Sequence, residues 1–261
     1  MWPRWVGSRV VHPAEADWSR FEILVTGDEL LAVPSVVHLV DRGQPVEGPE
    51  GVVYSTSPRV CTCTSGSYFV KGDSGDPGMV AAEVVGYTLA RSLKIDVPEF
   101  AIARDSQATF FASKNVDGCI RDALPFVRKH LGILTKVIVL DVLLFNNDRN
   151  VGGFVAHPKR GLVALDFEKS KAVRQQHPLI QLASFQPRSI WPQGVLGTIA
   201  RGAAIPGAFV REAKSLSDAQ LRSATLGAAQ VVPGYTWAEA SELALRRRRD
   251  KLEELVREVW Q

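Results

Sequence analysis

The sequence of 261 residues predicts an α+β protein with a β-rich first half and a helical second half. Two patterns and the composition lead to this fold class. Short runs of β-branched and aromatic residues alternate with turns in the first half, whereas longer apolar segments with helical spacing fill the second. In addition, 46% of the residues are hydrophobic and 23% are charged, which is ordinary for an ordered globular chain. We therefore expect one large domain or two closely joined lobes.

The first half contains strand runs and one helix start. Ser65 and Gly66 separate two of the runs and predict a tight hairpin. Asp76 followed by Pro77 predicts a helix that extends to about residue 94, because Asp caps free N–H groups and Pro fits the first helical position. The strands are expected at 21–25, 36–40, 52–54, 60–64, 67–71, 99–103 and 109–112.

The second half is predicted to be helical around one polar turn. An apolar helix at 131–145 ends at the sequence Asn146-Asn-Asp-Arg-Asn150. A long C-terminal helix is expected to begin with a capping box of Thr236 and Glu239, in which each side chain satisfies a free backbone N–H. The remaining elements are two short strands at 153–156 and 162–165 and helices at 191–201 and 217–230.

The charge of the chain argues against nucleic acid as a partner. The formal net charge is only +3, and a nucleic-acid binder usually gathers its Lys and Arg into a strong basic patch. The one basic run, Arg246 to Arg249, would wrap around a helix rather than face one ligand. We expect it to be a solvated face with salt bridges to Glu242 and Glu253; the alternative is a patch for phosphate or an acidic partner.

Cysteine, histidine and apolar patterns favour a cytoplasmic protein. Cys61, Cys63 and Cys119 lack the paired spacing of a zinc site, and the His residues show no metal-ligand spacing either. The cysteines are expected to be reduced and to behave as small hydrophobic residues. The most apolar segment, 137–145, is interrupted by Asp141 and is too short for a membrane span. The charged N-terminus does not look like a secretion signal.

Three residues at the ends of predicted elements form a possible phosphate and metal site. Lys71 ends a strand in Tyr-Phe-Val-Lys-Gly, Asp148 lies in the polar turn after the apolar helix, and Asp166 ends a strand in Leu-Asp-Phe-Glu. Taken singly, each has an ordinary structural explanation as a surface lysine, a turn residue or a cap. Their order suits phosphoryl transfer, in which a Lys holds phosphates, a carboxylate holds magnesium and an Asp accepts a hydroxyl proton.

The succession YFVKG, NNDRN and LDFE resembles the HipA-like kinases, which share their architecture with phosphatidylinositol 3- and 4-kinases. The resemblance covers about residues 50 to 260. It implies a two-lobed, protein-kinase-like fold with a β-rich N-lobe at 1–115 and a helical C-lobe at 116–261. It also implies ATP and Mg²⁺ as cofactors, and transfer of the γ-phosphate to a hydroxyl of a protein or a small molecule. A toxin–antitoxin context would fit, with an antitoxin or other regulatory protein as a possible partner.

The resemblance also implies roles for residues of the three motifs. Lys71 would contact the α-phosphate, Asp148 would be the catalytic base and Asp166 would be the metal ligand. Asn146 and Arg149 would shape the catalytic loop.

Two further assignments follow from position in the chain. Glu83 comes twelve residues after Lys71 on the predicted helix, where kinases place the glutamate that pairs with the lysine; the alternative is an exposed helix carboxylate. Ser55, Thr56 and Ser57 would cover phosphates as a phosphate loop does, with an ordinary Ser/Pro turn as the alternative.

The catalytic loop departs from the family pattern at two positions. Asn150 replaces the expected His, and Gly153 replaces the Asn expected five residues after the catalytic Asp. Three explanations are open for the missing metal ligand. Asn150 takes over the role, Glu168 supplies an oxygen from the same side of an extended segment as Asp166, or the protein has lost phosphotransfer.

These departures leave two rival functions beside a HipA-like kinase. A kinase-fold module that binds nucleotide or a partner without catalysis is favoured by Gly153. An enzyme like the aminoglycoside phosphotransferases is disfavoured, because Asn146 stands where their catalytic loop has His.

Overall fold

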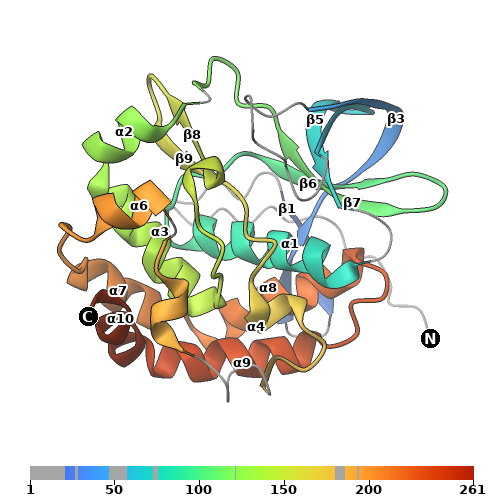
Figure 1. Ribbon diagram of the computed structural model, residues 1–261. Helices are drawn as coiled ribbons and strands as arrows, with labels where there is room; N and C mark the ends of the chain where they lie inside the picture. The colour runs from blue at the N-terminus through green and yellow to red at the C-terminus, as the bar shows by residue number, and fades with distance from the viewer. Residues whose placement is uncertain are drawn as a thin grey trace.

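A computed structural model of the protein describes residues 21–26, 29–46, 58–72, 76–120, 122–179, 186–192 and 194–261. Figure 1 shows a strand-rich region beside a larger helical region, with helix α1 (Pro77–Ser92) crossing the centre of the molecule between them. The predicted strand at 52–54 and the predicted phosphate-loop residues Ser55, Thr56 and Ser57 lie outside the described residues.

Five strands close into a small barrel in the order β3–β4–β5–β7–β6. The β3 strand pairs in parallel with β6, and the other neighbours pair antiparallel. Alternate residues such as Cys61, Cys63, Tyr68 and Val70 point inward and form the barrel's own small core. The strands are β3 (Val36–Pro45), β4 (Arg59–Cys63), β5 (Gly66–Lys71), β6 (Phe100–Arg104) and β7 (Thr109–Lys114).

A separate hairpin precedes the barrel. Its strands β1 (Phe21–Thr26) and β2 (Glu29–Pro34) pair antiparallel, and β2 lies against helix α8 (Asp218–Val231). The sequence predicted β1 but not β2.

Helix α1 begins as the sequence predicts. Asp76 is its N-cap and accepts the Met79 N–H at 2.9 Å, and Pro77 is the first helical residue. Every residue from Gly78 to Ala90 is buried, so this helix is covered on all sides, as expected of a helix in the middle of a core. It packs against α8, β7 and the short helix α4 (Lys171–Arg174).

The helical region surrounds α3 (Leu131–Leu144), the apolar helix that the sequence predicts. The buried residues of α3 and those of α1 belong to one continuous hydrophobic core. A short hairpin of β8 (Phe154–His157) and β9 (Gly161–Ala164) follows α3. The other elements are α2 (Leu124–Lys129), η1 (Val151–Gly153), η2 (Pro187–Ile190), α6 (Gly194–Ala200), α7 (Gly207–Lys214), α9 (Ala238–Asp250) and α10 (Leu252–Trp260).

The C-terminal helix differs from the prediction in two ways. It is two helices, α9 and α10, which meet at Lys251. The predicted capping box at its start is wrong, because Trp237 is the N-cap and makes no side-chain cap hydrogen bond. Instead, the Trp237 indole donates to the Val173 carbonyl at 2.7 Å, so a tertiary contact fixes this end. A capping box does occur at α8, between Ser217 and Gln220.

Within the described ranges, no helix combines the length and apolar character that crossing a bilayer demands.

Candidate functional site

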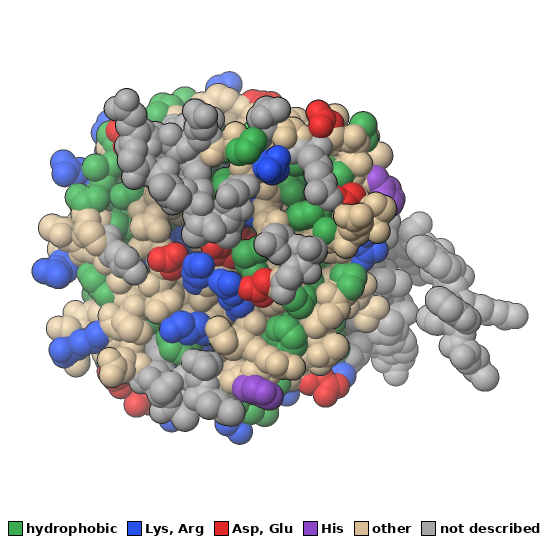
Figure 2. Space-filling view, turned by 45° about the vertical axis from the view of Figure 1, so that its right-hand side comes forward, with side chains coloured by type: hydrophobic (Ala, Val, Ile, Leu, Met, Phe, Trp, Pro, Cys, Tyr) green, Lys and Arg blue, Asp and Glu red, His purple; other side chains and the backbone are tan. Residues whose placement is uncertain are grey.

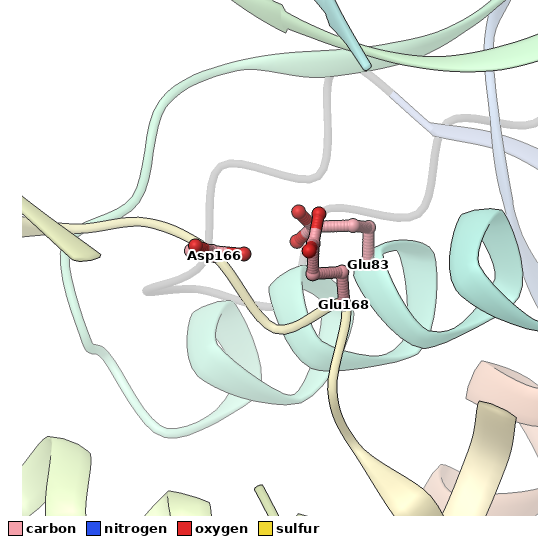
Figure 3. A group of neighbouring side chains, drawn as sticks. All are labelled: Glu83, Asp166 and Glu168. Carbon is pink, nitrogen blue, oxygen red and sulfur yellow. The ribbon is translucent and has the colours of Figure 1, made fainter. Parts of the chain in front are cut away.

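Lys71, Glu83 and Asp166 meet where the barrel, α1 and the chain after β9 come together. The Lys71 Nζ lies 3.1 Å from Glu83 Oε1 and 3.2 Å from Asp166 Oδ1. Lys71 is the last residue of β5, and Glu83 lies in the middle of buried α1 with its side chain 1% exposed. The alternative of an exposed helix carboxylate is therefore wrong for Glu83. In Figure 3, the Glu83 and Glu168 carboxylates lie next to each other and Asp166 points toward them.

The segment after β9 is fixed against α1 by backbone contacts. Asp166 has a left-handed φ of 64°, a conformation that Asp tolerates better than most residues. The next residue, Phe167, donates its backbone N–H to Glu83 Oε2 at 2.8 Å. A Cβ at Gly86 would lie 2.4 Å from the Phe167 Cβ, so glycine is what lets the Phe167 ring sit this close to the helix. The Tyr87 ring meets the Phe167 ring edge-on at 5.6 Å.

Burial and close charges shift the pKa values of this group in different directions. Burial acts against the Lys71 ammonium, but the carboxylates of Asp166 and Glu83 outweigh it and raise the pKa of Lys71 well above its ordinary value. Burial raises the pKa of Glu83 to about 7, although Lys71 opposes the rise. Burial and the Asp166 charge also raise the pKa of Glu168. Burial opposes ionisation of Asp166, but Lys71 and Arg149 outweigh it and lower its pKa. Asp166 is thus the most readily ionised of the three carboxyl groups.

The donor set at this point fits a divalent cation. Glu83, Asp166 and Glu168 each offer one carboxylate oxygen, and these oxygens lie within 4.8 Å of one another. The Asp166 Oδ1 is buried and, in the described part of the chain, accepts no hydrogen bond, although it is ion-paired with Lys71. Carboxylate oxygens are the ligands that Mg²⁺ prefers. The residues present therefore suit the cation that a kinase-like site uses.

The polar turn after α3 is organised by a buried ion pair. The Arg149 Nε lies 2.8 Å from Asp141 Oδ2, and both side chains are fully buried. The Asn146 amide donates to Asp141 Oδ1 at 2.8 Å. Arg149 also donates to the Leu165 carbonyl, which ties the turn to the chain just before Asp166. Sequence reasoning missed Asp141 as a partner, although an acid inside an apolar helix is a signal for a buried counter-charge.

Asp148 lies on the turn that follows α3. Asn146 and Ser170 form an isolated antiparallel bridge. The segment 146–148 therefore runs next to the segment 168–170. Asp148 itself is partly buried. The bridge therefore joins the turn to the segment that carries Asp166 and Glu168.

Gly153 and Asn150 have local reasons for their identity. A Cβ at position 153 would lie 2.6 Å from Arg149 Nη1, so the buried guanidinium occupies the space of a side chain. Asn150 is exposed, accepts the Gly152 N–H at 2.8 Å and donates to the Asp148 carbonyl at 3.0 Å. Its side chain is thus engaged within its own turn.

Arg248, predicted from the sequence to lie on a solvated basic face, belongs to this region instead. Its side chain donates to the carbonyls of Val142 at 2.9 Å and Leu143 at 3.0 Å, which lie at the C-terminal end of α3, where carbonyls lack helical partners. Its guanidinium also stacks 4.9 Å from the centre of the Phe145 ring. The predicted solvated face is therefore wrong for Arg248, which is 3% exposed.

The other arginines of this run match the prediction only in part. Arg246 contacts Glu242, as expected, and also Asp218 at 3.0 Å. Arg249 lies 2.6 Å from Asp218. Glu253 is paired with Lys214 and Arg257 instead. On the face that Figure 2 shows, basic and acidic side chains are interspersed rather than separated into a basic patch.

The barrel, the buried α1 with its Lys71–Glu83 pair and the helices beyond the α3 turn form a kinase-like fold. The crystal structure of the proinflammatory kinase CtkA from Helicobacter pylori is similar, with a TM-score of 0.53 and 13% identity over 87% of this chain and 97% of CtkA. An N-terminal 618-residue fragment of LepB from Legionella pneumophila aligns with a TM-score of 0.43 and 10% identity, over 75% of this chain and 44% of that fragment. The likeness to CtkA shows the fold.

Neither a protein-family model nor a curated protein sequence matches the chain.

Proposed function

We propose that this protein is an ATP-dependent phosphotransferase of the HipA-like type. The observation that carries the proposal is the Lys71 ammonium held 3.1 Å from Glu83 and 3.2 Å from Asp166. A lysine held by a helix glutamate next to a metal-binding aspartate is the arrangement that kinases use on ATP phosphates. The kinase-like fold supports the same assignment.

In this proposal the residues act by position and charge. Lys71 binds phosphate oxygens, and Glu83 keeps its ammonium oriented. Asp166 holds a Mg²⁺ ion, which when bound neutralises charge on the transferred phosphate. Asp148 accepts the proton of the acceptor hydroxyl as the oxygen–phosphorus bond forms and ADP leaves. Asn146 and Arg149 hold the turn that carries Asp148, through Asp141.

We propose further that the chain divides into two working parts. Residues 1–115, with Ser55, Thr56 and Ser57 as a phosphate loop, form the nucleotide-binding lobe, and residues 116–261 form the lobe that carries the acceptor. The acceptor is a hydroxyl of a protein Ser or Thr, or of a small molecule. A cytoplasmic setting with an antitoxin or other regulatory partner follows from the HipA-like resemblance.

The proposal is tested with γ-labelled ATP and Mg²⁺ on the purified protein. We expect label on the protein or on an added acceptor, and also release of labelled phosphate. Asp148→Ala should abolish transfer but keep nucleotide binding, and Asp166→Ala should abolish both transfer and metal-dependent binding. Asp117→Ala, which changes an exposed loop carboxylate, is the matched control. Transfer by Asp148→Ala at the parent's rate would show that Asp148 is not the base.

The alternative is a nucleotide-binding module without turnover. It is favoured by the contact between Arg149 and the backbone of Gly153, which leaves no room for the usual metal-binding Asn. In that case ATP and Mg²⁺ would raise the melting temperature, as any ligand of the folded state does, but no label would be transferred. No thermal shift with ATP or ADP would contradict both functions.

A further inference from the structure

The family pattern places a second protein oxygen for the cation at position 153. Mg²⁺ is usually bound by one or two protein oxygens together with phosphate oxygens and water. Gly153 has no side chain to offer. Another described residue can supply this oxygen, and the inference that follows rests on the proposed function.

Position 153 is closed to any side chain by Arg149. A Cβ there would lie 2.6 Å from Arg149 Nη1 and 3.4 Å from its Cδ. The guanidinium cannot easily move aside, because it is fully buried and paired with buried Asp141 at 2.8 Å. Moving it would leave the Asp141 carboxylate as an uncompensated buried charge, which is strongly unfavourable. The missing ligand is therefore excluded by the structure of the turn itself.

Asn150 does not supply the missing ligand. Its Oδ1 accepts the Gly152 N–H at 2.8 Å, and its Nδ2 donates to the Asp148 carbonyl at 3.0 Å. The Oδ1 thus caps η1, the Nδ2 holds the preceding residues of the turn, and the residue is exposed. The amide oxygen that would have to bind a cation is already used by the backbone.

Glu168, unlike Asn150, is buried next to the other carboxylates. Its side chain is 3% exposed, and one of its oxygens lies within 4.8 Å of oxygens of Asp166 and Glu83. Its backbone carbonyl faces Arg174 Nη1 at 3.5 Å, and Arg174 is ion-paired with Asp76 at 2.6 Å at the start of α1. The segment that carries Glu168 is therefore anchored beside Asp166.

The charges of this group call for a cation. Glu83 and Asp166 share the ammonium of Lys71, whereas Glu168 is paired with Lys169 at 3.5 Å. Gathering like charges in a buried site is unfavourable unless they are neutralised. A divalent cation between Asp166 and Glu168 would remove this repulsion and leave Glu83 to orient Lys71.

We propose that Glu168 supplies the second protein oxygen for the divalent cation, in place of the side chain that Arg149 excludes from position 153. The metal-binding pair is then Asp166 and Glu168, two residues apart on one segment, rather than one residue from that segment and one from the catalytic loop.

Binding of Mn²⁺ to the full chain, in the presence of a non-hydrolysable ATP analogue, tests this assignment. Glu168→Gln keeps the shape of the side chain and removes its charge. We expect it to weaken Mn²⁺ binding by about tenfold or more, while binding of the analogue in EDTA changes less than about twofold. Glu168→Asp should give an intermediate affinity. Asn150→Ala and the exposed-surface control Glu254→Gln should both stay within about twofold of the parent.

The metal-free melting temperature separates a ligand role from a structural one. If Glu168 is a ligand that repels its neighbours, Glu168→Gln should melt at or above the parent temperature in EDTA and lose its Mn²⁺-dependent increase. Equal Mn²⁺ affinity in Glu168→Gln and the parent would overturn the inference while leaving the phosphotransferase in place. A weaker affinity in Asn150→Ala than in Glu168→Gln would also overturn it. No Mn²⁺ binding by the parent with the analogue would overturn both the inference and the proposed function.

Discussion

Glu83 accepts the backbone N–H of Phe167 at 2.8 Å, across 84 positions of the chain. The same carboxylate pairs with Lys71 through its other oxygen. One side chain of α1 therefore contacts both the barrel lysine and the segment that carries Asp166 and Glu168. Any movement of α1 away from Phe167 would disturb both halves of the site at once.

Gly86→Ala should loosen this connection. The added Cβ would lie 2.4 Å from the Phe167 Cβ and 2.5 Å from its Cγ, so the ring or the helix has to move. Overpacking of this kind costs about 1–3 kcal/mol of stability. We expect a lower melting temperature and a smaller thermal shift with the ATP analogue and Mn²⁺. Gly132→Ala, at a helical glycine with open space around it, is the control and should not reduce either quantity.

Glu83 should also give the metal-free protein a characteristic pH dependence. Its pKa is raised from 4.5 to about 7, so between these values the folded state keeps a proton that the unfolded chain has lost. Stability from this group therefore falls as the pH rises through that window, and does not change below or above it. Glu83→Gln cannot ionise and should lose less stability than the parent between pH 4.5 and 7. Melting temperatures in EDTA across this range check the difference.

Other ionisable groups around Glu83 also affect how the stability of the protein depends on pH. Lys71, Asp166, Tyr87 and Glu168 face it, and the Asp166 pKa is lowered rather than raised. The comparison is therefore between parent and variant at each pH, not the slope of the parent alone. A constant difference in melting temperature from pH 4.5 to 7 would show that Glu83 ionises in the folded protein as it does in the unfolded chain.

Gly153→Asn restores the residue of the family pattern and should still fail to improve the site. Its Cβ would meet Arg149 Nη1 at 2.6 Å, so we expect a loss of about 1–3 kcal/mol and no gain in Mn²⁺ affinity. Gly153→Ala should destabilise the folded protein to a similar degree. Because Ala adds the Cβ without the amide, the comparison separates the effect of side-chain volume from that of the amide group. A Gly153→Asn protein with parental stability and tighter Mn²⁺ binding would show that the Arg149 side chain moves aside without cost, and would contradict this prediction.

The part of the site that the sequence predicts is the part set by local pattern. Lys71 ends a strand that alternation predicts, Asp166 follows another, and Glu83 lies on a helix whose start is marked by Asp76 and Pro77. Their meeting in space was expected from order in the chain together with the HipA-like resemblance. Periodicity alone does not predict it, because nothing local encodes the distance between β5 and β9.

The remaining features depend on contacts between distant segments. Arg149 fills the space beside Gly153 because Asp141 holds it there, and no spacing rule predicts that volume. Trp237 overrides the local capping signal of Thr236 and Glu239 by bonding to Val173. In both cases a tertiary contact decides between options that the local sequence leaves open.

Arg248 has a consequence for how the chain matures. The turn that carries Asp148 leaves the end of α3, and the carbonyls at that end are bound by a side chain more than 100 positions later. A growing chain that has not yet reached α9 lacks this partner, so the end of α3 has no such cap until Arg248 has been synthesised. The turn that carries Asp148 would therefore take its final form only after more than 100 further residues have been added.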